Sequence, residues 1–135
     1  NCRSLNGLRR RLELKKEAGA KFLQTQMVMD ANSLERFCNE IAIPLNLPVL
    51  TGVFLLKSAK NAIFINKVVP GACIPDSIIA RLDSAKHPID EGIKIAAEQI
   101  KQFVSLTKGV HIMAIKAEEK IPEIIDKANI SLLMN

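Results

Sequence analysis

Polar side chains follow each of three short apolar segments, at the point where the segment ends. The residues at these ends are Thr25, Gln26 and Asp30; Gly52, Val53 and Lys57; and Met113, Lys116 and Glu118. In a barrel of strand-then-helix units, the active site lies at the carboxyl ends of the strands. If the three segments are parallel strands, these residues are therefore the first candidates for a functional site.

Gln26 is the most informative of these residues. A strand-end amide offers two donors and an acceptor, and it can pair with a fused heterocycle that presents alternating N and C=O groups. From composition alone, a structural glutamine that satisfies loop backbone is the interpretation we favour. His111 lies near the start of the third segment, where strand alternation predicts a buried, hydrogen-bonded core residue.

Several kinds of site have no signal in this sequence. Asp76, Asp83, Asp90 and Glu91 lie at expected helix starts or surfaces, where capping and solvation account for them. No GxGxxG, Walker loop, GxSxG or HExxH motif occurs. The three cysteines are widely spaced and form no CxxC pair: Cys2, Cys38 and Cys73. His87 and His111 have no second candidate metal ligand nearby. We interpret the cysteines as reduced thiols of a cytosolic protein with no metal site.

The first half of the chain predicts two helices that alternate with two buried strands. Apolar residues at helical spacing give a helix that ends near Glu17, with Ala18 and Gly19 as its cap. A strand follows over residues 21–29, and then a helix in which Asn32 and Glu35 are arranged like a capping box and which Pro44 ends. The second strand, over residues 47–56, contains Gly52, and a strand glycine often marks close approach of a ligand or another backbone.

The second half predicts three helices, a third strand and a closing helix. Ser58 caps a helix to about Val68, with an apolar side of Ala62, Ile63, Ile65 and Val69. Pro75 begins a second helix, and a third runs from Asp90 to about Leu106. The strand covers residues 110–115 and the last helix residues 118–128, while the tail over residues 130–134 is ambiguous.

This alternation predicts an α/β protein with a parallel sheet, in one segment over residues 1–135. Three strand-then-helix units are too few to close a barrel. A three-stranded parallel sheet leaves two exposed edges, so either further strands belong to the same parent chain or copies pair edge to edge.

Composition excludes several classes of protein. Apolar residues make up 48% and charged residues 24%, which is typical of a globular domain. Six of the nineteen cations behind the net charge of +5 lie before residue 17, and with no Trp or Tyr to stack on bases we expect no nucleic-acid partner. No run is long enough to span a membrane. The chain starts at Asn1 without a signal-like segment, so we expect a cytoplasmic protein that is processed or cut from a longer one.

Four segments resemble methylenetetrahydrofolate reductases in the same order along the chain. KKEAGAKFLQTQMVMD (15–30) resembles the family's K-x-x-A-G-A-x-x-x-x-T-Q segment. The stretch of residues 51–82 resembles its strand, loop and helix with the Val-Pro-Gly and Ile-Pro turns, and GIKIAAEQI (92–100) and GVHIMAI (109–115) resemble its last helix and strand. The resemblance runs from about Leu8 to Ala128.

The resemblance implies a partial (β/α)8 TIM barrel, made of the last three β/α units with parallel strands. It also implies an FAD-dependent enzyme of one-carbon metabolism and methionine biosynthesis, which reduces 5,10-methylenetetrahydrofolate to 5-methyltetrahydrofolate. The electron donor would be a nicotinamide or ferredoxin. FAD passes the hydride, and the protein stacks flavin against pterin and protonates the leaving nitrogen.

Site residues carry over one by one. Gln26 matches the glutamine that hydrogen-bonds the pterin, Lys15 matches a basic residue that contacts the flavin cofactor, and Asn61 stands where some members have a folate-contacting glutamine. Ile65 replaces an aromatic that stacks on folate. Lys116 and Ala117 replace an Asn-Arg pair, and Lys116 offers a charge to the folate carboxylate. The family's catalytic glutamate belongs to the first barrel strand, so no catalytic residue is expected here.

Two other functions stay open. The chain could be a non-catalytic binding or assembly subunit that completes a barrel with a partner chain or with itself through its open edges. It could also be another barrel enzyme with a different substrate, because fold alone does not determine function.

Overall fold

The computed structural model describes residues 5–129 of the chain. Its helices and strands follow in the order α1 (Leu5–Glu17), β1 (Leu23–Met27), α2 (Ala31–Phe37), the π-helix η1 (Cys38–Ala42), β2 (Val49–Phe54), α3 (Ala59–Val68), α4 (Asp76–Ser84), α5 (Pro88–Phe103), β3 (Gly109–Met113), the 3-10 helix η2 (Glu118–Lys120) and α6 (Ile121–Ala128). The predicted alternation of strands and helices is confirmed. The tail at residues 130–134 lies outside the described residues.

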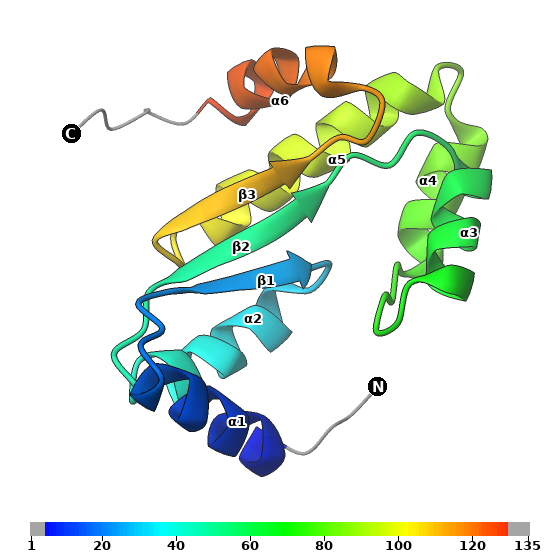
Figure 1. The fold of residues 1–135 in the computed structure, drawn as a ribbon. Coiled ribbons are helices and arrows are strands. Elements are labelled where there is room, and N and C mark those ends of the chain that lie inside the picture. The colour runs from blue at the N-terminus through cyan, green and yellow to red at the C-terminus, as the bar shows by residue number, and fades with distance from the viewer. Residues whose placement is uncertain (1–4, 130–135) are drawn as a thin grey trace.

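The sheet has three parallel strands in the order β1-β2-β3, as the alternation predicted (Figure 1). β2 is central, and its residues pair with both neighbours. Within the described residues, the outer edges of β1 and β3 have no partner strand. Parallel pairing needs a long crossover between successive strands, which α2 with η1 and then α3 to α5 supply.

One face of the sheet is covered by helices. α5 crosses behind β2 and β3, with α6 packed against it (Figure 1). Val49 and Val53 of β2 point to this side and join Ile93, Ile100 and Phe103 of α5 in the main core. Burial of these branched and aromatic side chains is the main source of the sheet's stability.

The opposite face carries the alternate residues of each strand, and we call it the open face: Gln24 and Met27 of β1, Leu50, Gly52 and Phe54 of β2, and Gly109, His111 and Met113 of β3. His111 is exposed, so the prediction that it is buried is wrong. Its neighbours Val110 and Ile112 are half-buried and pack against the main core, so the register turns these two residues, and not His111, toward the helices. A shift of one residue exchanges the two faces.

α3 and α4 stand beyond the carboxyl ends of the strands, at the end of the sheet to which the arrows point (Figure 1). A second core joins them to the first half of α5 through Ala62, Ile65, Leu82 and Ile95. Ile63 is 56% exposed, so its predicted place on the apolar side of α3 is wrong. A step of one residue turns about 100° around a helix, which carries Ile63 away from Ala62.

The helix ends are built from local hydrogen bonds. Asp30, not Asn32, is the N-cap of α2: its carboxylate accepts from the Asn32 backbone N–H at 3.0 Å and from Ser33 Oγ at 2.7 Å. The predicted capping box is therefore wrong. Ser58 caps α3 as predicted. Gly19 follows α1 at φ +112°, a conformation that favours glycine.

No helix within residues 5–129 is long and apolar enough to cross a membrane.

Candidate functional site

The carboxyl end of β1 is irregular. Gln24 pairs with Leu50 and Met27 pairs with Gly52, so Thr25 and Gln26 together face the single residue Thr51. This is a β-bulge, in which one extra residue is accommodated on one strand. Bulges re-aim side chains and are frequent next to active sites. The bulge lies at the carboxyl ends of the strands, where the candidate residues from the sequence lie.

Two close contacts build the bulge. Thr25 Oγ1 accepts a hydrogen bond from the Gly52 backbone N–H at 2.9 Å and donates one to the Gln26 carbonyl at 2.7 Å. A Cβ on Gly52 would lie 2.6 Å from the Gln26 carbonyl oxygen. The expectation that Gly52 marks a close approach is therefore confirmed, and the approaching group is the backbone of β1.

The side chain of Gln26 is exposed at the bulge. Within residues 5–129 its amide makes no hydrogen bond, so it does not serve the loop backbone in this structure. An amide that keeps its donors and its acceptor free can bind a heterocycle edge.

Asn61 lies in the first turn of α3, just after β2. Its Oδ1 accepts from the Lys57 backbone N–H at 3.2 Å, and its own backbone N–H donates to Ser58 Oγ at 3.0 Å. The side chain is half-buried. Asn61 therefore shapes the turn between β2 and α3, and its amide nitrogen remains as the group that could reach a ligand.

Lys116 lies in the loop after β3. Its φ is +57°, a left-handed conformation that non-glycine residues rarely adopt. Its backbone N–H donates to Glu118 Oε1 at 3.2 Å, which holds the loop while the side chain is exposed. Backbone strain of this kind clusters at functional sites. Gln26 thus lies near the end of β1, Asn61 follows β2 and Lys116 follows β3. All three belong to the carboxyl end of the sheet.

Two positions that depart from the family pattern belong to the core of this chain. Ile65 is 5% exposed and packs in the second core, and Ala117 is 3% exposed and packs in the main core. An aromatic or an arginine at these positions would need a different local packing. The replacements are therefore consistent with the fold and leave no space at these positions for the missing side chains.

Lys15 lies away from the other three candidates. It is exposed near the end of α1 and lines an open pocket of about 390 Å³ between α1, α2 and the unpaired edge of β1, together with Phe22 and Gln24. The pocket extends along β1 as far as Thr25, the residue before Gln26. Lys15 itself lies at the end of α1, where its backbone carbonyl accepts from the Ala20 N–H at 3.0 Å, ahead of β1.

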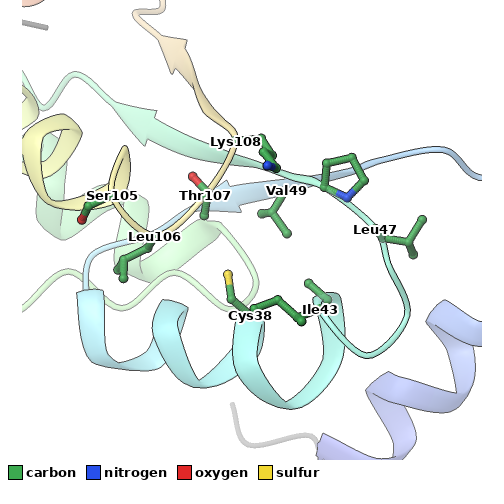
Figure 2. A pocket seen from close by; sticks show the side chains of 10 residues that line it. Cys38, Ile43, Leu47, Val49, Ser105, Leu106, Thr107 and Lys108 are labelled. Atoms are coloured by element: carbon green, nitrogen blue, oxygen red, sulfur yellow. The ribbon is translucent and has the colours of Figure 1, made fainter.

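A second pocket, of about 310 Å³, lies at the amino ends of β2 and β3 (Figure 2). Cys38 points into it from η1, across from Thr107 and Lys108, which precede β3 (Figure 2). Burial raises the pKa of the Cys38 thiol. Cys38 and Cys73 are free, Cys73 is exposed, and Cys2 lies outside the described residues. No candidate site residue of the sequence lines this pocket.

His111 lies on the open face of β3, although strand alternation in the sequence assigned it to the core. It lies directly opposite Gly52 in the register, and Gly52 lies opposite Met27. Gly52 has no side chain, and the Thr25 and Gln26 carbonyls lie over it, so no side chain of β2 stands between His111 and the bulge at this position. Reading the strand alternation in register with Gly52 would have found it. The described residues contain no group of three or more His, Cys, Asp or Glu that could hold a metal ion.

The comparison with family models agrees with this geometry, whereas a search of curated proteins finds no match to the chain. The family model described as methylenetetrahydrofolate reductase matches residues 2–129, nearly the whole length. That family implies a TIM barrel, and three parallel strands with helices between them are consistent with part of one. The chain belongs to the methylenetetrahydrofolate reductase family.

Proposed function

We propose that this chain is the substrate side of an FAD-dependent enzyme that reduces 5,10-methylenetetrahydrofolate to 5-methyltetrahydrofolate in one-carbon metabolism. It would contribute the last three β/α units of a TIM barrel. The observation that supports this most is the amide of Gln26, which has no hydrogen-bond partner within residues 5–129 and is exposed on a bulge at the carboxyl end of the sheet. Active sites of TIM barrels lie at the carboxyl ends of the strands.

In this proposal the chain binds and orients the folate. The Gln26 amide donates to and accepts from the edge of the pterin ring, whose alternating N and C=O groups match it. The amide nitrogen of Asn61 reaches the ligand from the α3 side. Lys116 attracts the glutamate carboxylate at the other end of the folate as a point charge. The three contacts orient the methylene group, and restricting a reactant in this way lowers the barrier.

FAD, when bound, supplies the hydride that reduces the methylene carbon, after reduction by a nicotinamide or ferredoxin. The residues of this chain fit one part of such a cofactor. Lys15 offers a positive charge at the rim of an open pocket that also contains the apolar Leu8, Leu12 and Phe22. A cation beside apolar side chains suits the remote, charged end of a dinucleotide. Lys15 would therefore hold that end, away from the ring that reacts beside Gln26.

The proton that the leaving nitrogen needs has no donor among these candidate residues. In the proposal it comes from a carboxyl group of the strands that complete the barrel, on the same parent protein or on a partner. A purely structural subunit is not favoured, because the family match extends across the candidate residues.

Ligand binding tests the proposal. The chain, together with the polypeptide that completes its sheet, is titrated with 5-methyltetrahydrofolate while the flavin absorbance is followed. The expected result is bleaching of the flavin band, since electrons return to the flavin in the reverse reaction. Gln26→Ala should weaken folate binding about tenfold, which is the loss of one to two hydrogen bonds.

Gln102→Ala is the control, because Gln102 is an exposed glutamine of α5 and belongs neither to the candidate site nor to the Lys15 pocket. It should leave the folate affinity unchanged. A Gln26→Ala protein that binds folate as tightly as the wild type would overturn the assignment of Gln26. Absence of flavin bleaching in the complete protein would overturn the reductase function.

A further inference from the structure

We infer that Thr25 is a positioning residue, whose hydroxyl holds the β1 bulge and so aims the Gln26 amide at the ligand. This inference rests on the proposed role of Gln26 in folate binding. Among the described residues, the Thr25 side chain bonds only to the backbone of its neighbours. The inference gives it a function that a threonine in a strand does not ordinarily have.

The Thr25 hydroxyl replaces part of the β-ladder. In a regular parallel pair, the Gly52 N–H would donate to a carbonyl of β1. Here it donates to Thr25 Oγ1 at 2.9 Å instead. The same hydroxyl uses its proton to donate to the Gln26 carbonyl at 2.7 Å. One side chain therefore links β2 to the peptide that carries Gln26.

Gly52 supplies the space for this arrangement. The position of a Cβ on Gly52 lies 2.8 Å from the Thr25 carbonyl oxygen and 2.6 Å from that of Gln26. Both carbonyls of the bulge therefore lie over Gly52. The regular ladder resumes one residue later, where the Val28 N–H donates to the Gly52 carbonyl at 2.9 Å.

The bulge decides the direction of Gln26 because strand side chains alternate between faces. One extra residue shifts the alternation of everything beyond it by one position. Without the hydroxyl, the N–H of the buried Gly52 loses its acceptor, and regular pairing with a β1 carbonyl becomes the way to satisfy it. Regular pairing would remove the bulge and turn the Gln26 side chain from its present direction.

Valine and serine separate the hydroxyl from the shape of threonine. Thr25→Val keeps the branched shape and removes the hydroxyl, whereas Thr25→Ser keeps the hydroxyl. We expect Thr25→Val to weaken binding of 5-methyltetrahydrofolate by roughly tenfold, as Gln26→Ala does, and Thr25→Ser to stay within about twofold of the wild type. In a Gln26→Ala background, Thr25→Val should cost nothing further, because the amide it positions is gone.

The experiment is titration of these variants with 5-methyltetrahydrofolate in the complete flavin-containing protein. Amide hydrogen exchange of Gly52, measured alongside, should lose protection in Thr25→Val alone. If Thr25→Val does not fold, Thr25→Ala takes its place in the same comparison. Wild-type affinity in the hydroxyl-free variant, or a further loss in the Gln26→Ala background, would overturn the positioning role while leaving the role of Gln26 intact. Wild-type affinity in Gln26→Ala would instead overturn the proposed function.

Discussion

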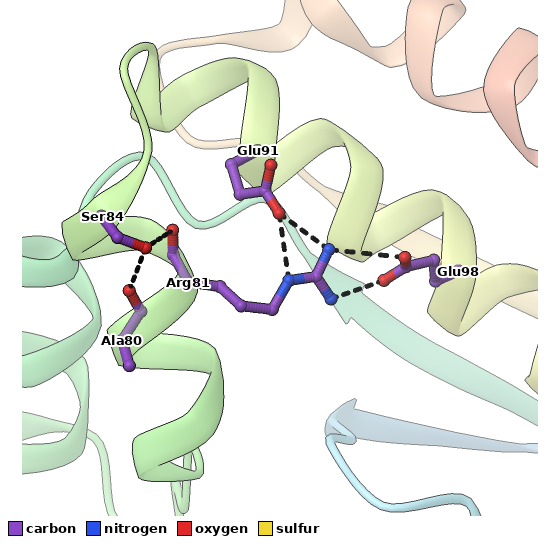
Figure 3. A network of polar contacts seen from close by, with 5 residues as sticks. All are labelled: Ala80, Arg81, Ser84, Glu91 and Glu98. Atoms are coloured by element: carbon purple, nitrogen blue, oxygen red, sulfur yellow. Dashed lines mark hydrogen bonds and ion pairs between the residues drawn. The ribbon is translucent and has the colours of Figure 1, made fainter.

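The guanidinium of Arg81 on α4 donates to Glu91 on α5 through Nε at 3.0 Å and through Nη2 at 2.8 Å. It also donates to Glu98, about two turns further along the same side of α5, through Nη1 at 2.7 Å (Figure 3). The hydrogen bond to Glu98, followed by that to Glu91, raises the pKa of Arg81, so the guanidinium stays charged. Arg81 thus fastens the α3–α4 pair, which carries Asn61, to the helix that lies behind the sheet.

Arg81→Met should destabilise the protein by about 1–2 kcal/mol, because a forked arginine with two carboxylates is stronger than a single exposed pair. Arg81→Lys should recover part of this loss, since lysine cannot fork. Urea unfolding measures the free energies. Arg36→Met is the control: Arg36 makes one exposed pair with Glu40 on its own helix segment, and we expect a change below about 0.5 kcal/mol. Equal losses at Arg36 and Arg81 would contradict the role of the fork.

Gly92 is required by close packing of α5 on the end of β2. A Cβ at this position would lie 1.8 Å from the Leu56 carbonyl oxygen. We expect Gly92→Ala to lower the free energy of unfolding by about 3 kcal/mol or to prevent folding. Thermal unfolding followed by circular dichroism measures this.

Gly71 provides the comparison, because nothing lies within 4 Å of its Cβ position although its φ is +82°. Gly71→Ala should therefore show only the conformational cost, about 1 kcal/mol. An alanine at Gly92 that is tolerated as well as one at Gly71 would be inconsistent with this packing of α5.

Gln99 buries an amide whose oxygen has no hydrogen-bond partner among the described residues. Gln99 is only 5% exposed. Its Nε2 donates to Met29 Sδ at 3.1 Å, while Oε1 has no partner among the described residues. Because a buried acceptor without a partner costs free energy, Gln99→Leu should stabilise the protein by about 1 kcal/mol. The midpoint of urea unfolding measures this. Gln102→Leu, at an exposed position of the same helix, should change stability by less than about 0.5 kcal/mol.

Asp30 should make stability depend on pH at the start of α2. The hydrogen bond from Ser33, and then that from the Asn32 backbone, lowers the pKa of Asp30 below its usual 3.8. Since the folded-state pKa lies below the unfolded value, the stabilisation is complete above pH 3.8. It disappears as the pH falls through the lower folded-state pKa.

Asp30→Ala should therefore cost about 1 kcal/mol at pH 7, the usual value of an N-cap, and less below the unfolded pKa. Unfolding midpoints of both proteins between neutral and strongly acidic pH test this. Asp30→Asn keeps a cap without a charge, so its own contribution should not vary with pH. A difference between the wild type and Asp30→Ala that stays constant across this range would contradict the assignment.

Local patterns predicted most of the secondary structure, because the signals for each element lie within a few residues of it. Ser58 and Gly19 are examples: a hydroxyl before an apolar periodic run and a glycine after one mark helix ends by themselves. Gly52 could be recognised as a position of close approach from its place in an apolar strand. The family could be recognised from ordered motifs such as the Thr25-Gln26 pair.

Register and packing decided what the sequence could not. Strand alternation determines that His111 and Ile112 face opposite sides, but the pairing of His111 with Gly52 decides which of them is exposed. In the same way, the bulge at Thr25 depends on a hydrogen bond to a residue 27 positions away. The amino-acid sequence by itself therefore determined the elements, the parallel sheet and the family. Only the tertiary structure decided which side chains face the open side, because that choice depends on contacts between distant segments.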